Sequence, residues 1–485
     1  MSPPGRPKGE HRSAQHEGIP VSHFCPVYPK PRASKASRWW LLFDARRSWL
    51  DNLYERSYAM KMGEIRLPGS RLYMVNEPAL VRRVLVERAA DYPKHRLMGD
   101  ALRPLLGDSI FTTSGAAWQR QRDMMNPAFA EARIDATFPQ MLRAVQAMTE
   151  RLDDVADGAV HDVEAEMTHV TADIIFRTIF STPLEGADAR RMFDAFARFQ
   201  VLAPRIAMPA LYGLGWMVPF WQTWQSRRCG REIRDLLGAL IRPRLEAYQA
   251  GRATGQRDIL AALLEARDAR SGQAMTFEEL LDQVAMLFLA GHETSASALT
   301  WALHLLANAP DVQDRLAAEV RGVIGARLPE AGELREFELA RRVFRETLRL
   351  FPPVGFLARE AAAPDCMRDK QMAAGSAVVI APWLIHRHRE LWERPDEFDP
   401  DRFASPAGRE SARQAFLPFG MGPRVCIGAA FAMQEAVLVL AALAQRYRFA
   451  PVPGDVPEPV GRLTIRSANG VRLSVRRRAL EAVAP

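Results

Sequence analysis

The spacing of apolar residues along the chain predicts a mostly helical protein. Apolar residues recur at steps of three and four, as on one face of a helix, for example in 170–180 and 280–306. Runs with strand character are short and lie near the two ends of the chain, at 63–75, 377–382 and 471–475. This distribution predicts a mainly α fold with small β-sheets.

Prolines and glycines set the expected limits of these elements. A hairpin is expected around Pro68 and Gly69, Pro78 opens a helix, and Pro310 ends the longest one. Helices are expected at 45–58, 78–86, 116–126, 138–155, 164–178, 221–250, 258–267, 277–308, 311–323, 339–350 and 427–445. The segment 93–114 is loop-like, and the apolar segment 201–221 is broken by several prolines and glycines, so both are expected to be irregular.

Charge is unevenly distributed along the chain. The whole sequence carries a net charge of +8, and residues 1–38 hold seven basic and two acidic residues, which account for +5 of it. The remaining excess is small, so the charge gives no argument for nucleic-acid binding. Because residues 1–38 are rich in Pro, Gly and Ser, we expect a disordered basic tail there, followed by a single domain over 39–485.

The four cysteines, Cys25, Cys229, Cys366 and Cys426, are scattered without CxxC spacing. No apolar run reaches the ~18 residues that a membrane span needs, and no hydrophobic signal-peptide region is visible. We therefore expect no disulfide framework, no signal peptide and no transmembrane anchor, and a soluble cytoplasmic protein.

Cys426 lies in the glycine-rich loop Phe419-Gly420-Met421-Gly422-Pro423-Arg424-Val425-Cys426-Ile427-Gly428. Gly420, Gly422 and Gly428 would let backbone N–H groups approach a sulfur atom closely. The helix expected just after the cysteine presents its positive N-terminal end, which favours a thiolate, and Arg424 can pair with a carboxylate. A lone cysteine is more often a small buried residue, but the whole loop favours a thiolate that binds iron.

This loop resembles the haem-binding loop of the cytochrome P450 family, which has Phe, Gly, Arg, Cys and Gly at the positions of Phe419, Gly422, Arg424, Cys426 and Gly428. The resemblance implies that Cys426 is the proximal iron ligand of haem b (iron protoporphyrin IX). It extends from about residue 45 to residue 478 and leaves out the tail 1–38. It therefore implies the P450 fold, with haem between a long distal helix and the helix that follows the cysteine loop.

Polar residues interrupt the apolar helix 277–308 at Ala290-Gly291-His292-Glu293-Thr294. Small side chains leave room for a flat cofactor, a threonine hydroxyl can bond back to its helix, and an acid can relay protons. The family's distal helix has the same arrangement, which implies that Glu293 and Thr294 deliver protons and that Ala290 and Gly291 face the haem. Ordinary satisfied helix residues are the alternative. A zinc HExxH site is excluded because Ala296 stands where the second histidine would be.

Glu346 and Arg349 stand three residues apart and share one face of an expected helix. Alone, they would form a surface ion pair worth less than about 1 kcal/mol. In the P450 family this pair precedes a proline-rich bend, here Pro352-Pro353, and is locked by a later arginine, here Arg402 of Pro400-Asp401-Arg402-Phe403. The resemblance thus implies a buried structural network of Glu346, Arg349 and Arg402.

Further contacts with the haem propionates follow from the same resemblance. Trp118 and Arg122 are four residues apart on an expected helix, and family members use this spacing to hold a propionate. Arg359 occupies another position at which an arginine commonly meets a propionate, and His95 is a further candidate. For Arg359 and His95 the alternative is a solvated side chain.

The resemblance implies a monooxygenase that inserts one oxygen atom of O2 into a substrate. Met286, Phe356 and Leu357 are expected in the pocket and favour a hydrophobic organic substrate. No flavin or ferredoxin segment is visible, so we expect a separate ferredoxin or flavoprotein reductase to dock on the cysteine side, near Arg120, Arg122, Arg413 and Arg424. Segment 201–220 is either a lid that also touches a membrane surface or a buried lid.

Two rival functions stay open at this point. A haem-thiolate peroxygenase or isomerase tends to lose the acid–threonine pair, whereas Glu293 and Thr294 are both present. The other rival is a haem-binding sensor or carrier without turnover, which the sequence does not separate from an enzyme.

Overall fold

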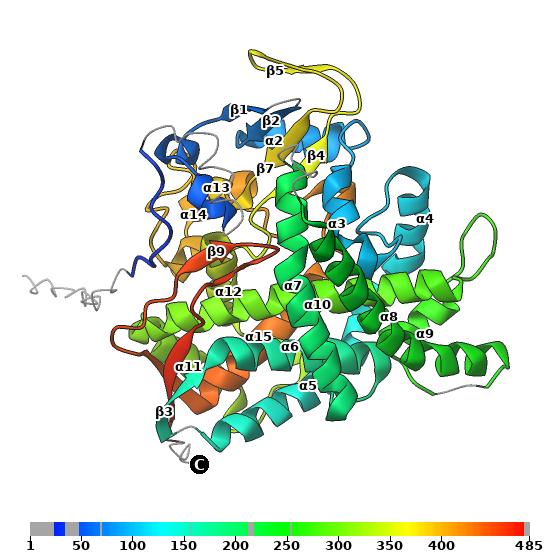
Figure 1. Ribbon diagram of the computed structural model, residues 1–485. Helices are drawn as coiled ribbons and strands as arrows, with labels where there is room; N and C mark the ends of the chain where they lie inside the picture. The colour runs from blue at the N-terminus through cyan, green and yellow to red at the C-terminus, as the bar shows by residue number, and fades with distance from the viewer. Residues whose placement is uncertain are drawn as a thin grey trace, which may run out of the picture.

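The computed structural model describes residues 24–33, 48–67, 70–155, 157–211, 218–252 and 255–479. Most of them are helical (Figure 1). The longer helices are α3 (Arg96–Leu106), α4 (Gly115–Met125), α5 (Glu131–Asp153), α6 (Val163–Phe180), α7 (Gly186–Leu211), α8 (Phe220–Gln249), α10 (Phe277–Ala307), α11 (Pro310–Ile324), α12 (Glu338–Leu350), α14 (Pro406–Ala415) and α15 (Ala429–Arg446). Shorter ones are α2 (Pro78–Arg82), α9 (Ile259–Glu265) and α13 (Pro382–Ile385).

The strands form small sheets. The largest has the order β1 (Met62–Leu67), β2 (Ser70–Val75), β7 (Ala377–Ile380), β4 (Leu357–Glu360), with β2 and β7 parallel and the other pairs antiparallel. The others are β3 (Asp157–Asp162), β11 (Arg472–Arg477) and β8 (Tyr447–Pro451), then β9 (Pro459–Gly461) with β10 (Ile465–Ser467), and β5 (Asp365–Met367) with β6 (Lys370–Met372). The largest sheet lies at the top of Figure 1 and the helices fill the centre and right. The prediction of a mainly α fold with small sheets is confirmed.

Helix α10 forms the centre of the core. It begins with a capping box, in which the Thr276 hydroxyl accepts from the Glu279 amide (3.2 Å) and the Glu279 carboxylate accepts from the Thr276 amide (2.9 Å). It packs against α6, α8, α12 and α15. Because neighbours cover it on several sides, it is apolar almost all round, which explains the long apolar run in the sequence.

Helix α15, which follows the cysteine loop, is also part of this core. Among the described residues it is the one helix long and apolar enough to cross a membrane, and 67% of it is buried inside the protein. Core helices of globular proteins have the same composition, so its apolar character is explained by packing against α5, α11 and α12.

Two segments that we expected to be irregular contain helices. Helix α3 lies within 93–114 although Pro104 is in it, and α7 continues through residues 201–211. Both pack against α8. At Gly230 of α8 a Cβ atom would lie 2.5 Å from the Pro104 carbonyl oxygen, so the absence of a side chain lets α3 approach closely. Tertiary packing therefore outweighs the local breakers. Residues 212–217 lie outside the described residues.

The N-terminal part of the domain also differs from the expectation. In place of one helix over 45–58, the described residues form two short 3-10 turns, Trp49–Asn52 and Glu55–Tyr58, separated by the extended Leu53. Residues 24–33, which we had placed in a disordered tail, pair with the domain: the Arg32 amide donates to the Leu53 carbonyl (3.0 Å) and the Phe398 amide to the Phe24 carbonyl (2.9 Å). The rest of the tail and residues 34–47 lie outside the described residues, so the tail and its boundary stay predictions.

Candidate haem site

The cysteine loop connects α14 with α15 and owes its shape to two glycines. Gly420 and Gly422 have φ values of +70° and +74°, in the left-handed region, and a Cβ at Gly422 would lie 2.0 Å from the Leu85 carbonyl oxygen. The Cys426 amide donates to the Phe419 carbonyl (2.9 Å) and closes the loop. Gly428 differs from the expectation, because its φ is −90° and it needs no glycine-specific backbone.

Cys426 lies just before the N-terminus of α15, and the residue is exposed. Desolvation raises the pKa of the thiol, whereas a hydrogen bond from the Gly428 amide and the charges of Arg122 and Lys94 lower it. Gly428 therefore favours the thiolate through its backbone amide. Because Cys426 is exposed, there is room for an iron atom at its sulfur.

A group of cationic side chains lies beside the loop, and no carboxylate within the described residues neutralises it. Lys94 is half-buried and donates to the Phe111 carbonyl (2.8 Å), and Arg359 is buried and donates to the neighbouring Ala358 carbonyl (3.1 Å). Arg424 lies over the Trp118 ring (4.4 Å to its centre) and donates to the Thr113 carbonyl (3.1 Å). Burial lowers the pKa of Arg359 to about 10, with a further contribution from Arg424.

These cations fit the two propionates of a haem. Among the described residues, the contacts of Lys94, Arg359 and Arg424 are to carbonyl, hydroxyl and aromatic groups, none of which balances their charge. The buried Nη1 of Arg424 and Nδ1 of His95 have no hydrogen-bond partner among the described residues. Buried charges and donors without partners are costly. A cofactor with two carboxylates would supply the missing acceptors.

Trp118 and Arg122 have separate places on α4. Trp118 is buried and stacks on Arg424. Arg122 donates to the Val425 carbonyl of the cysteine loop (2.9 Å) and to the Asn126 side chain (2.8 Å). The structure therefore attaches Arg122 to the loop itself. Lys94 was missed in the sequence because no motif marks it, although it stands next to His95.

On α10, Ala290 and Thr294 interrupt an otherwise buried helix. Ala290 is exposed, and the Thr294 hydroxyl donates back to the Ala290 carbonyl (2.7 Å). Gly291 was expected to face the haem, but a Cβ there would lie 2.9 Å from Ile175 of α6. Its missing side chain therefore allows close packing of α10 against α6. Ala290 and Thr294 thus form the accessible part of this helix turn.

Glu293 is buried and points into a polar network. Its Oε1 accepts from the Thr464 hydroxyl (2.6 Å) and from Nε of Arg466 (3.0 Å), and its Oε2 accepts from Nη2 of Arg466 (2.9 Å) and from the Gln200 amide. Burial raises its pKa, but Arg466 and Thr464 outweigh this, so the net pKa is lowered. These three partners come from α7 and the β9–β10 hairpin, and no local motif identifies them.

Behind the loop, Glu346 and Arg349 of α12 are completely buried together with Arg402. Arg349 forms two hydrogen bonds of 2.8 Å with the Glu346 carboxylate, and Nε of Arg402 donates to the same carboxylate at 3.2 Å. Arg349 also donates to the His386 carbonyl (2.9 Å), and the His386 ring accepts from the Leu417 amide (3.0 Å). The network therefore reaches the start of the cysteine loop.

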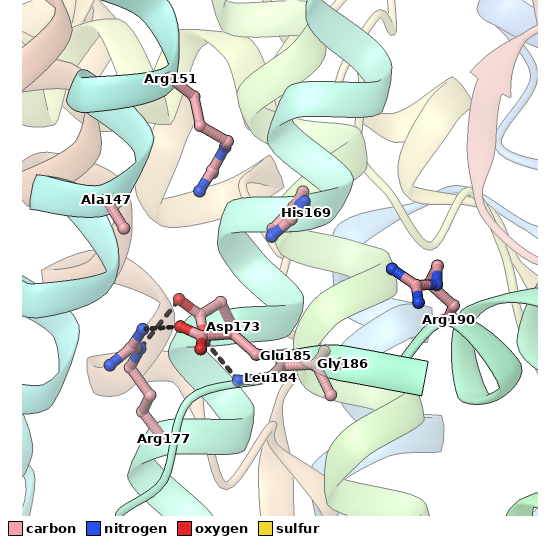
Figure 2. A pocket seen from close by; sticks show the side chains of 9 residues that line it. All are labelled: Ala147, Arg151, His169, Asp173, Arg177, Leu184, Glu185, Gly186 and Arg190. Atoms are coloured by element: carbon pink, nitrogen blue, oxygen red, sulfur yellow. Dashed lines mark hydrogen bonds and ion pairs between the residues drawn. The ribbon is translucent and has the colours of Figure 1, made fainter. Parts of the chain in front are cut away.

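A separate surface cavity of about 370 Å³ lies between α5, α6 and the start of α7 (Figure 2). In its lining, Arg177 pairs with Asp173 (2.8 Å), and the Asp173 carboxylate also accepts from the Leu184 amide (2.9 Å). None of the cysteine-loop or α10 residues described above lines it. It is therefore a different feature from the haem site.

The fold thus brings the cysteine loop, a cluster of cations and the accessible turn of α10 into one candidate site. A family model described as Cytochrome P450 matches residues 40–470. The chain belongs to the cytochrome P450 family, and it is a haem-dependent monooxygenase, an oxidoreductase.

Relatives and solved structures agree with this assignment. The chain is 35% identical over 402 residues to Cyclooctatin synthase of Streptomyces melanosporofaciens, covering 82% of this chain and 84% of that protein. It is 32% identical to Cyclooctat-9-en-7-ol 5-monooxygenase of the same organism (81% and 83% covered) and 30% identical to Pentalenene oxygenase of Streptomyces avermitilis (84% and 89%). The structure of the cytochrome P450DA haem domain matches with a TM-score of 0.76 at 26% identity, over 87% of this chain and 90% of that one.

Proposed function

We propose that this protein holds haem b through Cys426 and inserts one atom of O2 into a C–H bond of a hydrophobic substrate, with electrons from a separate redox partner. The observation that carries the proposal is the exposed Cys426 near three cations that lack carboxylate partners among the described residues. When bound, the haem supplies the binding and reductive activation of O2.

The chain's own residues have distinct tasks in this proposal. Lys94, Arg359 and Arg424, with His95, bind the propionates and fix the orientation of the cofactor. Ala290 leaves room on the open face of the haem. The Thr294 hydroxyl is the proton donor at the position where O2 would bind, which we call the oxygen site. Glu293, whose carboxylate is held by Arg466, exchanges protons with that site.

For the substrate, we propose an apolar molecule that contains rings. Relatives that cover most of the chain are named for cyclooctat-9-en-7-ol, pentalenene and 11-oxo-beta-amyrin. Met286 and Leu289 of α10 are buried, and Phe356 and Leu357 are half-buried, so this chain offers apolar side chains near the expected pocket. A panel of ring hydrocarbons and their alcohols, titrated against the spin state of the iron, tests the proposal. Open-chain fatty acids that shift the spin state more strongly than the cyclic compounds would contradict it.

For the redox partner, we propose an acidic ferredoxin or flavoprotein that docks on the cysteine side. Arg122 donates to the Val425 carbonyl of this loop and has no carboxylate partner among the described residues, whereas Arg424 is assigned to a propionate. Arg120 is paired with Asp268 and Glu279, and Arg413 with Glu410, so these two arginines contribute less charge than we expected from the sequence. The docking surface is therefore narrower than the sequence alone indicated.

We further propose that the protein is cytoplasmic and can touch a membrane surface at the start of α8 rather than through a deep anchor. Phe220, Trp221 and Trp224 expose 81%, 61% and 47% of their surface, and Arg227 and Arg228 follow them. Exposed aromatics next to basic residues are typical of interfacial helices. Sedimentation with anionic vesicles tests this: Trp221→Ser together with Trp224→Ser should abolish binding, and binding that persists in the double variant would contradict it.

The monooxygenase function is tested by reconstitution with a surrogate reductase. We expect product that requires both O2 and the electron donor, and we expect Thr294→Ala to divert most of the O2 consumed to hydrogen peroxide. Product formed with hydrogen peroxide but not with O2 and reductase would identify a peroxygenase instead. O2 binding without any product would identify a sensor or carrier.

A further inference from the structure

Arg466, on β10, lies between two carboxylates. Its Nε and Nη2 donate to the two oxygens of Glu293 at 3.0 and 2.9 Å, and its Nη1 donates to Oε1 of Glu164 at 3.0 Å. Nη1 also approaches the Thr168 hydroxyl at 3.4 Å. A single guanidinium group therefore binds two carboxylates. A change in the charge of either carboxylate changes how strongly the guanidinium binds the other.

The two acids occupy different surroundings. The Glu293 side chain is 4% exposed, in the middle of α10, whereas Glu164, in the first turn of α6, is 17% exposed and is the one nearer to solvent. Burial raises the pKa of both and Arg466 lowers both, with opposite net results: the pKa of Glu293 is lowered and that of Glu164 is raised. Two coupled carboxyls with opposite shifts are suited to different tasks in proton exchange.

The other polar groups that face this pair are few. Asp162 adds negative charge next to Glu164, and burial lowers the pKa of His292, next to Glu293, so its ring stays neutral. Gln200 from α7 and Thr464 from the β9–β10 hairpin are uncharged donors to Glu293. Among the described residues, Arg466 therefore exerts the largest attraction on the Glu293 carboxylate, and Glu164 shares this arginine.

We propose that Arg466 is a positioning residue shared by Glu293 and Glu164, and that Glu164 thereby sets how readily Glu293 exchanges its proton beside Thr294. When Glu164 is ionised, it holds part of the guanidinium and repels the Glu293 carboxylate, which eases protonation of Glu293. When Glu164 is neutral, Arg466 pairs with Glu293 alone and keeps it ionised. The inference rests on the proposed function, in which Glu293 handles protons for oxygen reduction.

Glu164→Gln and Arg466→Lys should move the titration of Glu293 in opposite directions. Glu164→Gln removes a competing negative charge, so the pKa of Glu293 should fall. Arg466→Lys keeps the positive charge but loses the bidentate hydrogen bonds to the Glu293 carboxylate, so the pKa of Glu293 should rise. Each shift should be about one pH unit, equivalent to roughly tenfold in the proton equilibrium.

The primary measurement is infrared spectroscopy of the ferric, haem-loaded protein, which needs no turnover. The carbonyl band of protonated Glu293 is identified by its loss in Glu293→Gln, and its titration is followed over pH in each variant. The alkaline limb of product formed per O2 consumed should shift in the same direction as this titration. Arg448→Gln is the matched control, because Arg448 pairs with Asp314 (3.2 Å) on the exposed side of β8, and it should leave the titration unchanged.

Opposite shifts in the two variants support the proposal. An unchanged titration in Glu164→Gln, or shifts of the same sign in both variants, overturns it. A role of Arg466 in stability alone would lower the free energy of unfolding in Arg466→Lys without moving the titration, and that result also overturns the proposal. A wild-type protein that makes no product would contradict the proposed function, while the infrared titration would still decide this inference.

Discussion

At the scale of single residues, the site contains two kinds of buried charge. Glu346 is surrounded by donors, since Arg349, Arg402 and the Asp399 amide (3.0 Å) all bond to it. Arg359 is buried and Lys94 is half-buried, but neither has a carboxylate partner among the described residues. The first kind is complete within the protein and holds the fold, whereas the second kind requires an anion from outside the chain.

Glu346→Gln should therefore destabilise the protein by about 3 to 5 kcal/mol, because it leaves two buried arginines without their anion. The pKa of Glu346 is lowered from its ordinary value of 4.5, so its contribution to stability is present above that pH and is lost as the pH falls through the lower value of the folded state. Urea unfolding at neutral pH measures the loss. Glu338→Gln, at an exposed position of the same helix, should change the free energy of unfolding by less than about 0.5 kcal/mol, and an equal effect of the two substitutions would refute this account.

Gly422→Ala should reduce haem binding. The alanine would need an unfavourable positive φ, and its Cβ would overlap the Leu85 carbonyl oxygen, so the cysteine loop would have to move. Haem content after expression measures the effect. Gly454→Ala is the control, since Gly454 also has a positive φ, of +79°, but a Cβ there meets nothing within 4 Å. If both variants retain haem equally well, the close approach at Gly422 does not shape the site.

At the scale of elements, a buried hydrogen bond joins α10 to α15. The Ser295 hydroxyl of α10 donates to Oε2 of Glu435 on α15 at 2.5 Å, and Oε1 of Glu435 has no partner among the described residues. Burial raises the pKa of Glu435 to about 8, against a small opposing effect of Ser295. The acid is therefore neutral at pH 7, which is the state that a buried, singly bonded carboxyl favours.

This contact predicts a fall in stability between pH 4.5 and about 8, because over this range the folded protein binds a proton at Glu435 that the unfolded chain does not. The size should be on the order of 3 to 5 kcal/mol. Glu435→Gln, which cannot ionise, should lose this dependence and should exceed the wild type in stability above pH 8. Urea unfolding over pH tests it, with Glu390→Gln at an exposed position as the control. A wild-type curve that does not fall over this range would show that Glu435 is ionised in the core.

How far the elements could be predicted depended on what stabilises them. Helix α10 was recognisable because its caps and its apolar run are local in the sequence. Helix α7 was missed over 201–211 and α3 was taken for a loop, since packing against α8 overcomes their prolines and glycines. In the site, Cys426 and Thr294 belong to local motifs, whereas Lys94 and Arg466 become visible only when segments distant in sequence meet.

At the scale of the whole molecule, charge on the cysteine side determines how electrons arrive. Arg122 is the arginine of the proposed docking surface that no carboxylate neutralises within the described residues, since Arg424 is assigned to a propionate. The rate of reduction by an acidic ferredoxin should therefore fall as salt increases, because screening weakens steering. Arg122→Gln should lower that rate severalfold at low salt, and Arg413→Gln, which loses an arginine already paired with Glu410, should lower it less. Reduction that is independent of salt would exclude this docking surface.

The central claim is that Cys426 holds a haem iron as a thiolate. The most direct measurement is the difference spectrum of the dithionite-reduced, haem-loaded protein with and without carbon monoxide, compared with that of Cys426→His. We predict the strongly red-shifted Soret band typical of thiolate ligation in the wild type, and its replacement in Cys426→His by the less shifted band of a nitrogen-ligated haem. A wild-type spectrum without the red-shifted band, or the same band in both proteins, would contradict the assignment of Cys426 as the iron ligand.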